Sequence, residues 1–282
     1  MDIGVGLPTT IDGVDAATVL EWARRAEGAG FSSLGTIDRL VYGNWESLVA
    51  LSAAAAVTER IKLMTSILLT PLRPNAAMLA KQTATIDRLS GGRLVLGLAV
   101  GGRADDYEAS GVDITRRGRV FDAQLAELRA VWSGERGIGP SPARAGGPEV
   151  IIGGTSDAAV RRVVDHASGW IAGGGGVDAF AATATRVRDA WAEAGRDGRP
   201  RLLALGYYSL GPAARTNADA YIQHYYGFLG PVAEQIAQGV LVSDAQVRDE
   251  LAAFESAGCD EVVLFPSSPD VSQVDLLAAA RG

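Results

Sequence analysis

Apolar positions along the chain follow two alternating spacings. Short runs rich in Val, Ile and Leu have the length of buried strands, and each is followed by a stretch with apolar residues at helical spacing. The predicted strands are residues 3–7, 32–37, 61–69, 94–98, 149–152, 169–172, 202–208 and 261–265. The predicted helices are residues 15–29, 47–58, 75–89, 118–132, 156–166, 177–194 and 271–281, with several helical turns within 217–257.

Strands that alternate with helices of this length predict a parallel sheet. Eight such units in 282 residues suit a single α/β domain, a closed (β/α)₈ TIM barrel over residues 1–282. The alternative is a doubly wound open sheet. It is disfavoured because Gly4 and Gly6, within the first strand, are followed by Leu7, Pro8 and Thr9, so the dinucleotide-binding turn is missing.

Composition excludes several function classes. The chain has 33 acidic and 26 basic residues and a net charge of −7, which argues against nucleic-acid binding. A lone cysteine, Cys259, excludes an internal disulfide and a thiolate metal site. The first residues carry no signal-peptide pattern, and no apolar run approaches the roughly 20 residues of a membrane span. We therefore expect a cytoplasmic protein without a membrane partner.

In a (β/α)₈ barrel the functional residues follow the C-terminal ends of the strands. Outside the glycine-rich turns, this rule selects Pro8, Thr9, Thr10, Asp38, Arg39, Tyr42, Trp45, Thr65, Ser66, Ile67, Gly101, Gly102, Arg103, Asp105, Asp106, Tyr107, Tyr207 and Tyr208. Pro8, Trp45 and Tyr207 are predicted to line a substrate pocket. His224 joins them, because it stands among tyrosines near a predicted lid.

The segment after the fifth predicted strand has the pattern of a phosphate cradle. Gly153 and Gly154 let backbone N–H groups approach an anion, and Thr155 and Ser156 precede a helix whose N-terminus favours negative charge. A tight capped turn without a ligand explains the same pattern. Gly173 and Gly174, in a run of four glycines after the sixth strand, indicate close approach of a flat ligand or phosphate, or simply a flexible loop.

Asp38 and Arg39 follow the second predicted strand. They can form an ion pair with each other, or they can serve as an acid–base group and an anion anchor. Arginine stays protonated at neutral pH, so a base near Arg39 must be Asp38, Tyr42 or bound water. Asp38, Arg39 and Tyr42 are the predicted catalytic residues.

The sequence shows no pattern for metal binding or for nucleophilic catalysis. Asp105 and Asp106 are consecutive acids without a histidine nearby, so we predict no metal and a solvated or capping role for them. The two histidines, His166 and His224, lie far apart, and neither belongs to a metalloprotease motif or a nucleophile–histidine–acid pattern.

Taken together, these residues resemble the luciferase-like (bacterial luciferase-type) family of flavin- and deazaflavin-dependent oxidoreductases. The most specific similarity is Leu89-Ser90-Gly91-Gly92-Arg93 followed by Leu96-Gly97-Leu98. Residues 61–69, 27–31, 152–154 and 257–261 also match the family pattern.

The resemblance implies a barrel with the cofactor ring over its mouth. It implies a strand-three bulge with a non-proline cis peptide at Ser66-Ile67, and a cofactor phosphate near Gly153-Gly154. The predicted cofactor-binding residues are Thr65, Ser66, Ile67, Gly101, Gly102, Gly153, Gly154, Thr155, Ser156, Gly173 and Gly174. Members are often dimers, so a homodimer is also implied.

One position departs from the family pattern. Many deazaflavin-dependent members have Asp-His after the second strand, whereas this chain has Asp38-Arg39. That change disfavours alcohol oxidation and favours hydride transfer from the deazaflavin coenzyme F420 to the C=N or C=C bond of a small molecule. The alternatives are a monooxygenase that uses reduced FMN, with a flavin reductase as partner, and a flavin-binding barrel without turnover.

Overall fold

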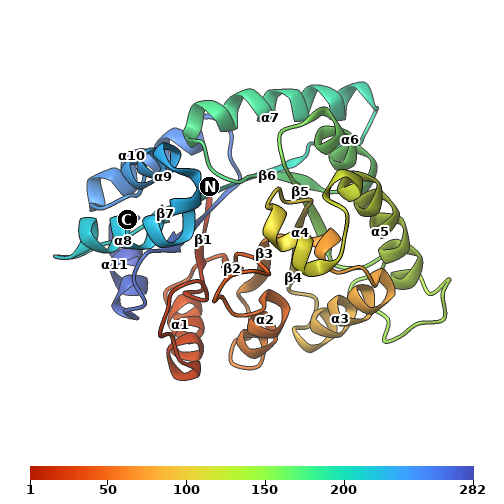
Figure 1. Ribbon diagram of the computed structural model, residues 1–282, viewed down its shortest axis with the longest axis horizontal. Helices are drawn as coiled ribbons and strands as arrows, with labels where there is room; N and C mark the ends of the chain where they lie inside the picture. The colour runs from red at the N-terminus through yellow and green to blue at the C-terminus, as the bar shows by residue number, and fades with distance from the viewer.

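The computed structural model describes residues 1–282 as a closed barrel of eight parallel strands in chain order, with β1 hydrogen-bonded to β8. The helices surround the strands (Figure 1). The strands are β1 (Asp2–Gly6), β2 (Ser33–Thr36), β3 (Lys62–Leu69), β4 (Leu94–Ala99), β5 (Glu149–Gly153), β6 (Gly169–Ala172), β7 (Arg201–Tyr208) and β8 (Glu261–Pro266). The predicted barrel is confirmed, and the open sheet is wrong.

The outer layer is helical. The helices are α1 (Ala16–Gly28), α2 (Ser47–Ala55), α3 (Ala76–Leu89), α4 (Ala104–Ser110), α5 (Arg117–Trp132), α6 (Asp157–His166), α7 (Gly176–Glu193), α8 (Ala214–Tyr226), α9 (Pro231–Gln238), α10 (Asp244–Ser256) and α11 (Ser272–Ala280). Three 3₁₀ turns complete them: η1 (Thr70–Leu72), η2 (Ile114–Arg116) and η3 (Gly227–Leu229). No helix is both long and apolar enough to cross a membrane.

Local sequence explains where many helices begin and end. Helix α3 begins after Asn75, whose side chain accepts a hydrogen bond from the backbone N–H of Met78, and it ends before Gly91 and Gly92, both at positive φ. Ser156 caps α6 in the same way as Asn75 caps α3. The predicted boundaries therefore agree with the observed ones to within a few residues.

Helix α4 is not among the predicted helices, whereas the helical turns predicted within 217–257 are confirmed. Helix α4 occupies residues expected to form a solvated or capping segment, and its buried residues are Asp106 and Tyr107. The region 217–257 resolves into the end of α8, then η3, α9 and α10. Both regions depend on packing over the barrel mouth, which no local pattern records.

Strand β3 carries the predicted irregularity. The peptide bond between Ser66 and Ile67 is cis. The pairing with β4 shifts between Thr65 and Leu68, so that β3 has one residue more than its partner strand over this stretch. The implied bulge and cis bond are both confirmed, and they place Ile67 at the C-terminal end of the barrel.

The core has two parts. A cluster of 52 buried residues fills the layer between strands and helices, and a second cluster of 16 fills the barrel interior and its mouth. Glycine leaves room inside: a Cβ atom on Gly35 would lie 2.8 Å from the ring of Phe265. The interior cluster continues through Tyr207 into α8, which covers one side of the mouth.

Candidate functional site

A hollow of about 290 Å³ opens at the C-terminal end of the barrel. It is lined by residues from β3 to β7 and the turns after them: Ser66, Ile67, Ala99, Gly153, Gly154, Ile171, Ala172, Gly173 and Leu205. Five predicted cofactor residues therefore meet in one place, although they come from three separate strand ends: Ser66, Ile67, Gly153, Gly154 and Gly173.

The missing side chains of the glycines create this hollow. A Cβ atom on Gly153 would collide with the side chain of Ile67, so the bulge of β3 and the end of β5 fit together only without it. A Cβ atom on Gly173 would meet nothing within 4 Å. Gly154 has a φ of +109°, which other residues rarely adopt. The backbone is thus open to a ligand at Gly173 and fixed in conformation at Gly154.

The remaining predicted cradle residues lie beside the hollow and do not line it. The Ser156 hydroxyl accepts the backbone N–H of Ala159, 3.2 Å away, so it caps α6. Thr155 is exposed, and its carbonyl accepts a hydrogen bond from Arg186. Gly174 has a φ of +116° in the turn before α7. The capped turn, which is the alternative interpretation of this segment, is therefore present together with the glycine-lined hollow.

Thr65, Gly101 and Gly102 also lie outside the lining. The Thr65 hydroxyl is buried and donates to the carbonyl of Gly97 at 2.8 Å, which ties β3 to β4. Gly101, at a φ of +67°, lies over the side chain of Leu69. Their predicted contacts with a cofactor stay predictions.

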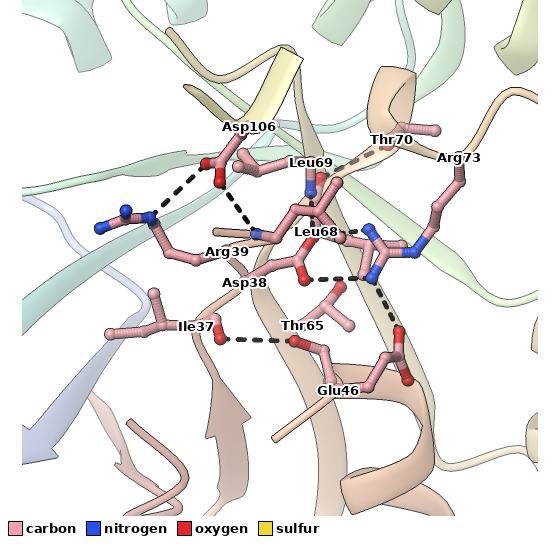
Figure 2. Close-up of polar contacts among 12 residues, drawn as sticks. Ile37, Asp38, Arg39, Glu46, Thr65, Leu68, Leu69, Thr70, Arg73 and Asp106 are labelled. Atoms are coloured by element: carbon pink, nitrogen blue, oxygen red, sulfur yellow. Dashed lines mark hydrogen bonds and ion pairs between the residues drawn. The ribbon is translucent and has the colours of Figure 1, made fainter. Parts of the chain in front are cut away.

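Asp38 and Arg39 do not pair with each other. Figure 2 shows their side chains pointing to different partners. The Asp38 carboxylate accepts two hydrogen bonds from Arg73, at 2.6 and 3.0 Å, and one from the backbone N–H of Leu69 at 2.8 Å. Burial lowers the pKa of Arg73, but the bonds and charge of Asp38 outweigh burial and raise it. The proposed internal ion pair is wrong, and Asp38 instead anchors the end of β3.

Arg39 is held by the two acids at the start of α4. Its Nε lies 3.5 Å from Oδ2 of Asp106, and its Nη2 lies 3.6 Å from Oδ2 of Asp105. Asp106 is 1% exposed and accepts the backbone N–H groups of Leu40 and Val41 at 3.1 and 2.6 Å. Neither role predicted for Asp106 is observed: the carboxylate is buried, it caps no helix, and it fixes the loop after β2.

The Tyr42 side chain lies between this loop and α8. Its hydroxyl is 2.7 Å from Nδ1 of His224, and its ring packs edge-on against Tyr225 at 4.9 Å between centroids. Burial and the charge of Asp12 raise the pKa of Tyr42 to about 12, while the nearby Arg39 guanidinium, 5.1 Å from the ring centroid, lowers it in part. Tyr42 is therefore a protonated phenol at neutral pH.

The profile of the luciferase-like monooxygenase family matches residues 1–253. The chain belongs to this family. An uncharacterized protein of Mycobacterium tuberculosis strain H37Rv is 34% identical over 170 residues, which cover 56% of this chain and 60% of that protein. The chain thus spans less than two thirds of the length of that relative.

Two solved structures share the luciferase-like fold. An F420-dependent secondary alcohol dehydrogenase, in complex with an F420-acetone adduct, has a TM-score of 0.81 at 18% identity over all of both chains. The oxygenating constituent of 3,6-diketocamphane monooxygenase from Pseudomonas putida, in complex with FMN, has a TM-score of 0.75 at 16% identity, over 99% of this chain and 96% of that one. Membership of the family supports an oxidoreductase or monooxygenase, and both cofactor types occur among its structural neighbours.

The predicted substrate-pocket residues of this luciferase-like chain separate into two groups. Tyr207 is buried at the mouth, with its hydroxyl 2.6 Å from that of Tyr226, and His224 lines a second hollow beside α8. Trp45 packs against the outer cluster between strands and helices, and Pro8 is buried at the end of β1. Pro8, Trp45 and Tyr207 line neither hollow, so their pocket roles stay predictions.

Sequence reasoning missed the residues that support this site. Arg73 belongs to the family-like stretch after β3, yet only the fold shows that it pairs with Asp38. The tyrosines of α8 approach Tyr42 because the helix turns back over the barrel mouth. Tyr221, for example, bonds Thr10 through their hydroxyls at 2.8 Å. No group of three or more His, Cys, Asp or Glu side chains is arranged to hold a metal ion.

Proposed function

We propose that this luciferase-like protein uses the deazaflavin coenzyme F420 and transfers a hydride to the C=N or C=C bond of a small molecule. The observation that carries the proposal is the Tyr42 phenol, protonated at neutral pH and bonded to His224 at 2.7 Å. Asp38 and Asp106, the buried acids near it, are both committed to protein partners. The arrangement suits delivery of a proton better than its removal from an alcohol.

The glycine-lined hollow fits the cofactor. A flat ring needs an apolar wall and close approach to the main chain, which Ile67, Ile171, Leu205 and Gly173 supply. A phosphate is held by backbone N–H groups at glycines near a helix N-terminus, which is the arrangement of Gly153 and Gly154 before α6. When bound, the reduced deazaflavin supplies the hydride.

Tyr42 donates the proton that must accompany the hydride. Its Arg39 neighbour stabilises the negative charge that develops on the phenol oxygen, since a cation beside the ring lowers the cost of ionising it. His224, whose side chain is 56% exposed, returns a proton to Tyr42 from solvent. Arg39 in turn is held in place by Asp106.

Asp38 acts by positioning in this scheme. Its carboxylate accepts the backbone N–H of Leu69, two residues after Ile67, and joins it to Arg73. An acid with both oxygens bound by an arginine is a poor proton carrier. We therefore assign Asp38 to the support of the β3 bulge and leave the proton transfer to Tyr42.

Oxygenation with reduced FMN is the second candidate. Oxygen chemistry requires a site that excludes water, and the aromatic side chains of α8 bury Tyr207 and Tyr221 at the mouth. This function would need a flavin reductase as partner. In either case the substrate is a small molecule, and a homodimer is the assembly we propose.

A fluorescence titration of the purified protein with F420 and, separately, with FMN tests the proposal. We expect tighter binding of the deazaflavin, and bleaching and recovery of its absorbance when a hydride donor and an unsaturated acceptor are added in turn. Tighter binding of FMN, with oxygen uptake when the reduced flavin and substrate are present, would replace it with the monooxygenase. A bound cofactor that no donor or acceptor changes would indicate a barrel without turnover.

A further inference from the structure

A second hollow, of about 530 Å³, lies between the turn after β1 and helix α8. It is separate in its lining from the glycine-lined hollow, because no residue belongs to both. Its walls come from the ends of β1 and β8 and from one face of α8: Thr10, Ile11, Asp12, Asn217, Ala220, Tyr221, His224 and Ser267.

The polar groups of this hollow favour a ligand that donates hydrogen bonds. The Asp12 side chain is 71% exposed and accepts no hydrogen bond from the chain, and Nε2 of His224 lies 3.6 Å from its Oδ2. The Ser267 side chain is 4% exposed, and its hydroxyl has no hydrogen-bond partner. A buried hydroxyl without a partner costs free energy, which a ligand atom would recover. Both groups can accept a hydrogen bond from a ligand.

The permanent charge of the hollow is that of Asp12. Neither lysine nor arginine lines it, and the one lining side chain that can become a cation is His224, 3.6 Å from Asp12, so a carboxylate or phosphate would meet the Asp12 charge first. The glycine-lined hollow has the opposite preference, because backbone N–H groups and a helix N-terminus attract anions. The glycine-lined hollow therefore suits the anionic group of a cofactor, and the hollow beside α8 suits a ligand that carries no negative charge.

We propose that the hollow between the β1 turn and α8 binds the substrate and selects one that carries a protonated amine near its reducible bond. This inference rests on the proposed function, whose substrate class it narrows. Asp12 pairs with the ammonium group, and Ser267 accepts a hydrogen bond deeper in the pocket. His224 contributes to the wall and also bonds the Tyr42 hydroxyl, so a substrate held here lies beside the proposed proton donor.

Three probes of nearly equal size test the charge preference without any cofactor. Benzylamine, benzyl alcohol and benzoate are titrated separately into the full-length protein at neutral pH and low salt, with binding followed by saturation-transfer NMR. We expect benzylamine to bind up to about fivefold more tightly than the alcohol, as for an exposed ion pair, and benzoate to bind most weakly. Equal binding of all three, or tighter binding of benzoate, would overturn the proposal.

Matched variants test whether Asp12 is the source of the preference for the amine. Asp12→Asn should remove the preference for the amine over the alcohol, whereas Asp219→Asn should keep it. Asp219 is on the same helix as His224, is exposed and pairs with Arg215 at 2.9 Å, yet it lies outside the hollow. An amine preference that remains in Asp12→Asn would contradict the assignment of Asp12 as the partner of the ammonium group. Ser267→Ala should weaken amine and alcohol alike, and unchanged binding of both would also count against it.

The failure of this inference is distinguishable from that of the proposed function. Tight cofactor binding with turnover, but no amine preference, leaves the hydride transfer intact and removes the amine subsite. An amine preference that is lost in Asp12→Asn, in a protein that binds neither F420 nor FMN, removes the proposed function and retains the ligand preference of the pocket.

Discussion

The absence of a Cβ atom at three glycines determines what the glycine-lined hollow can bind. Gly153 and Gly154 are constrained by the protein itself, the first by Ile67 and the second by its positive φ. A large side chain at Gly154 would therefore disturb the backbone as well as block a ligand. Gly173 is the cleaner position, because a side chain there meets open space.

Gly173→Leu should weaken cofactor binding by tenfold or more, because the new side chain occupies the hollow without a clash in the protein. Fluorescence titration with F420 or FMN measures the loss. Gly28→Leu is the control, since Gly28 is exposed on α1 and also has nothing within 4 Å of its ideal Cβ position. Equal affinity in both variants would mean that the cofactor binds elsewhere.

Tyr42→Phe should lower turnover by about 10²-fold or more, the usual effect of a positioned acid, with cofactor affinity unchanged. The matched control is Tyr225→Phe, which loses a hydroxyl on the ring that packs against Tyr42. Steady-state kinetics separates the two variants. Full turnover by Tyr42→Phe would transfer the proton-donor role to another group.

At the scale of elements, helices α4 and α8 position the side chains that form the candidate site at the mouth of the barrel. Helix α4 brings Asp106 to the loop after β2, and α8 brings Tyr226 to Tyr207 and His224 to Tyr42 at the mouth. The 3₁₀ turn after α8 continues the cover: the ring of Phe228 lies 3.7 Å from the Arg103 guanidinium carbon. Charged and aromatic side chains thus join the loops after β2 and β4 to α8 and to the 3₁₀ turn that follows it.

Asp106→Ala should lower the free energy of unfolding by about 3–5 kcal/mol, the usual cost of leaving a buried charge without its partner. Two loop N–H groups also lose their acceptor. Urea unfolding measures the change. The control is Asp105→Ala, which removes a carboxylate that is 39% exposed and should cost less than about 1 kcal/mol. Similar losses for both would show that Asp106 does not hold the loop.

Over the whole molecule, all seven tyrosines share one electrostatic property. Burial raises the pKa of each of them above the usual 10.0, to about 12 for Tyr42 and Tyr107. An unfolded chain therefore loses these protons at lower pH than the folded one. The resulting contribution to stability is complete below pH 10 and is lost as the pH rises through the folded values.

We expect the melting temperature to stay level with respect to tyrosine ionisation up to about pH 10 and to fall steeply between about pH 10 and 12. Tyrosinate absorbance and circular dichroism, recorded on the same samples, should change together. Ionisation of most tyrosines near pH 10 in a still-folded protein would show that the cluster at the mouth is open to solvent.

The sequence by itself determined the barrel and the glycine turns after β5 and β6, and its resemblance to the family implied the bulge at Ser66-Ile67. These features depend on local spacing, on residue types with narrow backbone preferences and on contiguous family motifs. Tertiary structure alone decided that Asp38 pairs with Arg73, that Asp106 is buried beneath the β2 loop and that His224 reaches Tyr42. Those contacts join residues 35, 65 and 182 positions apart. Which residues pair is set by how the helices pack over the mouth, and spacing along the chain does not encode that packing.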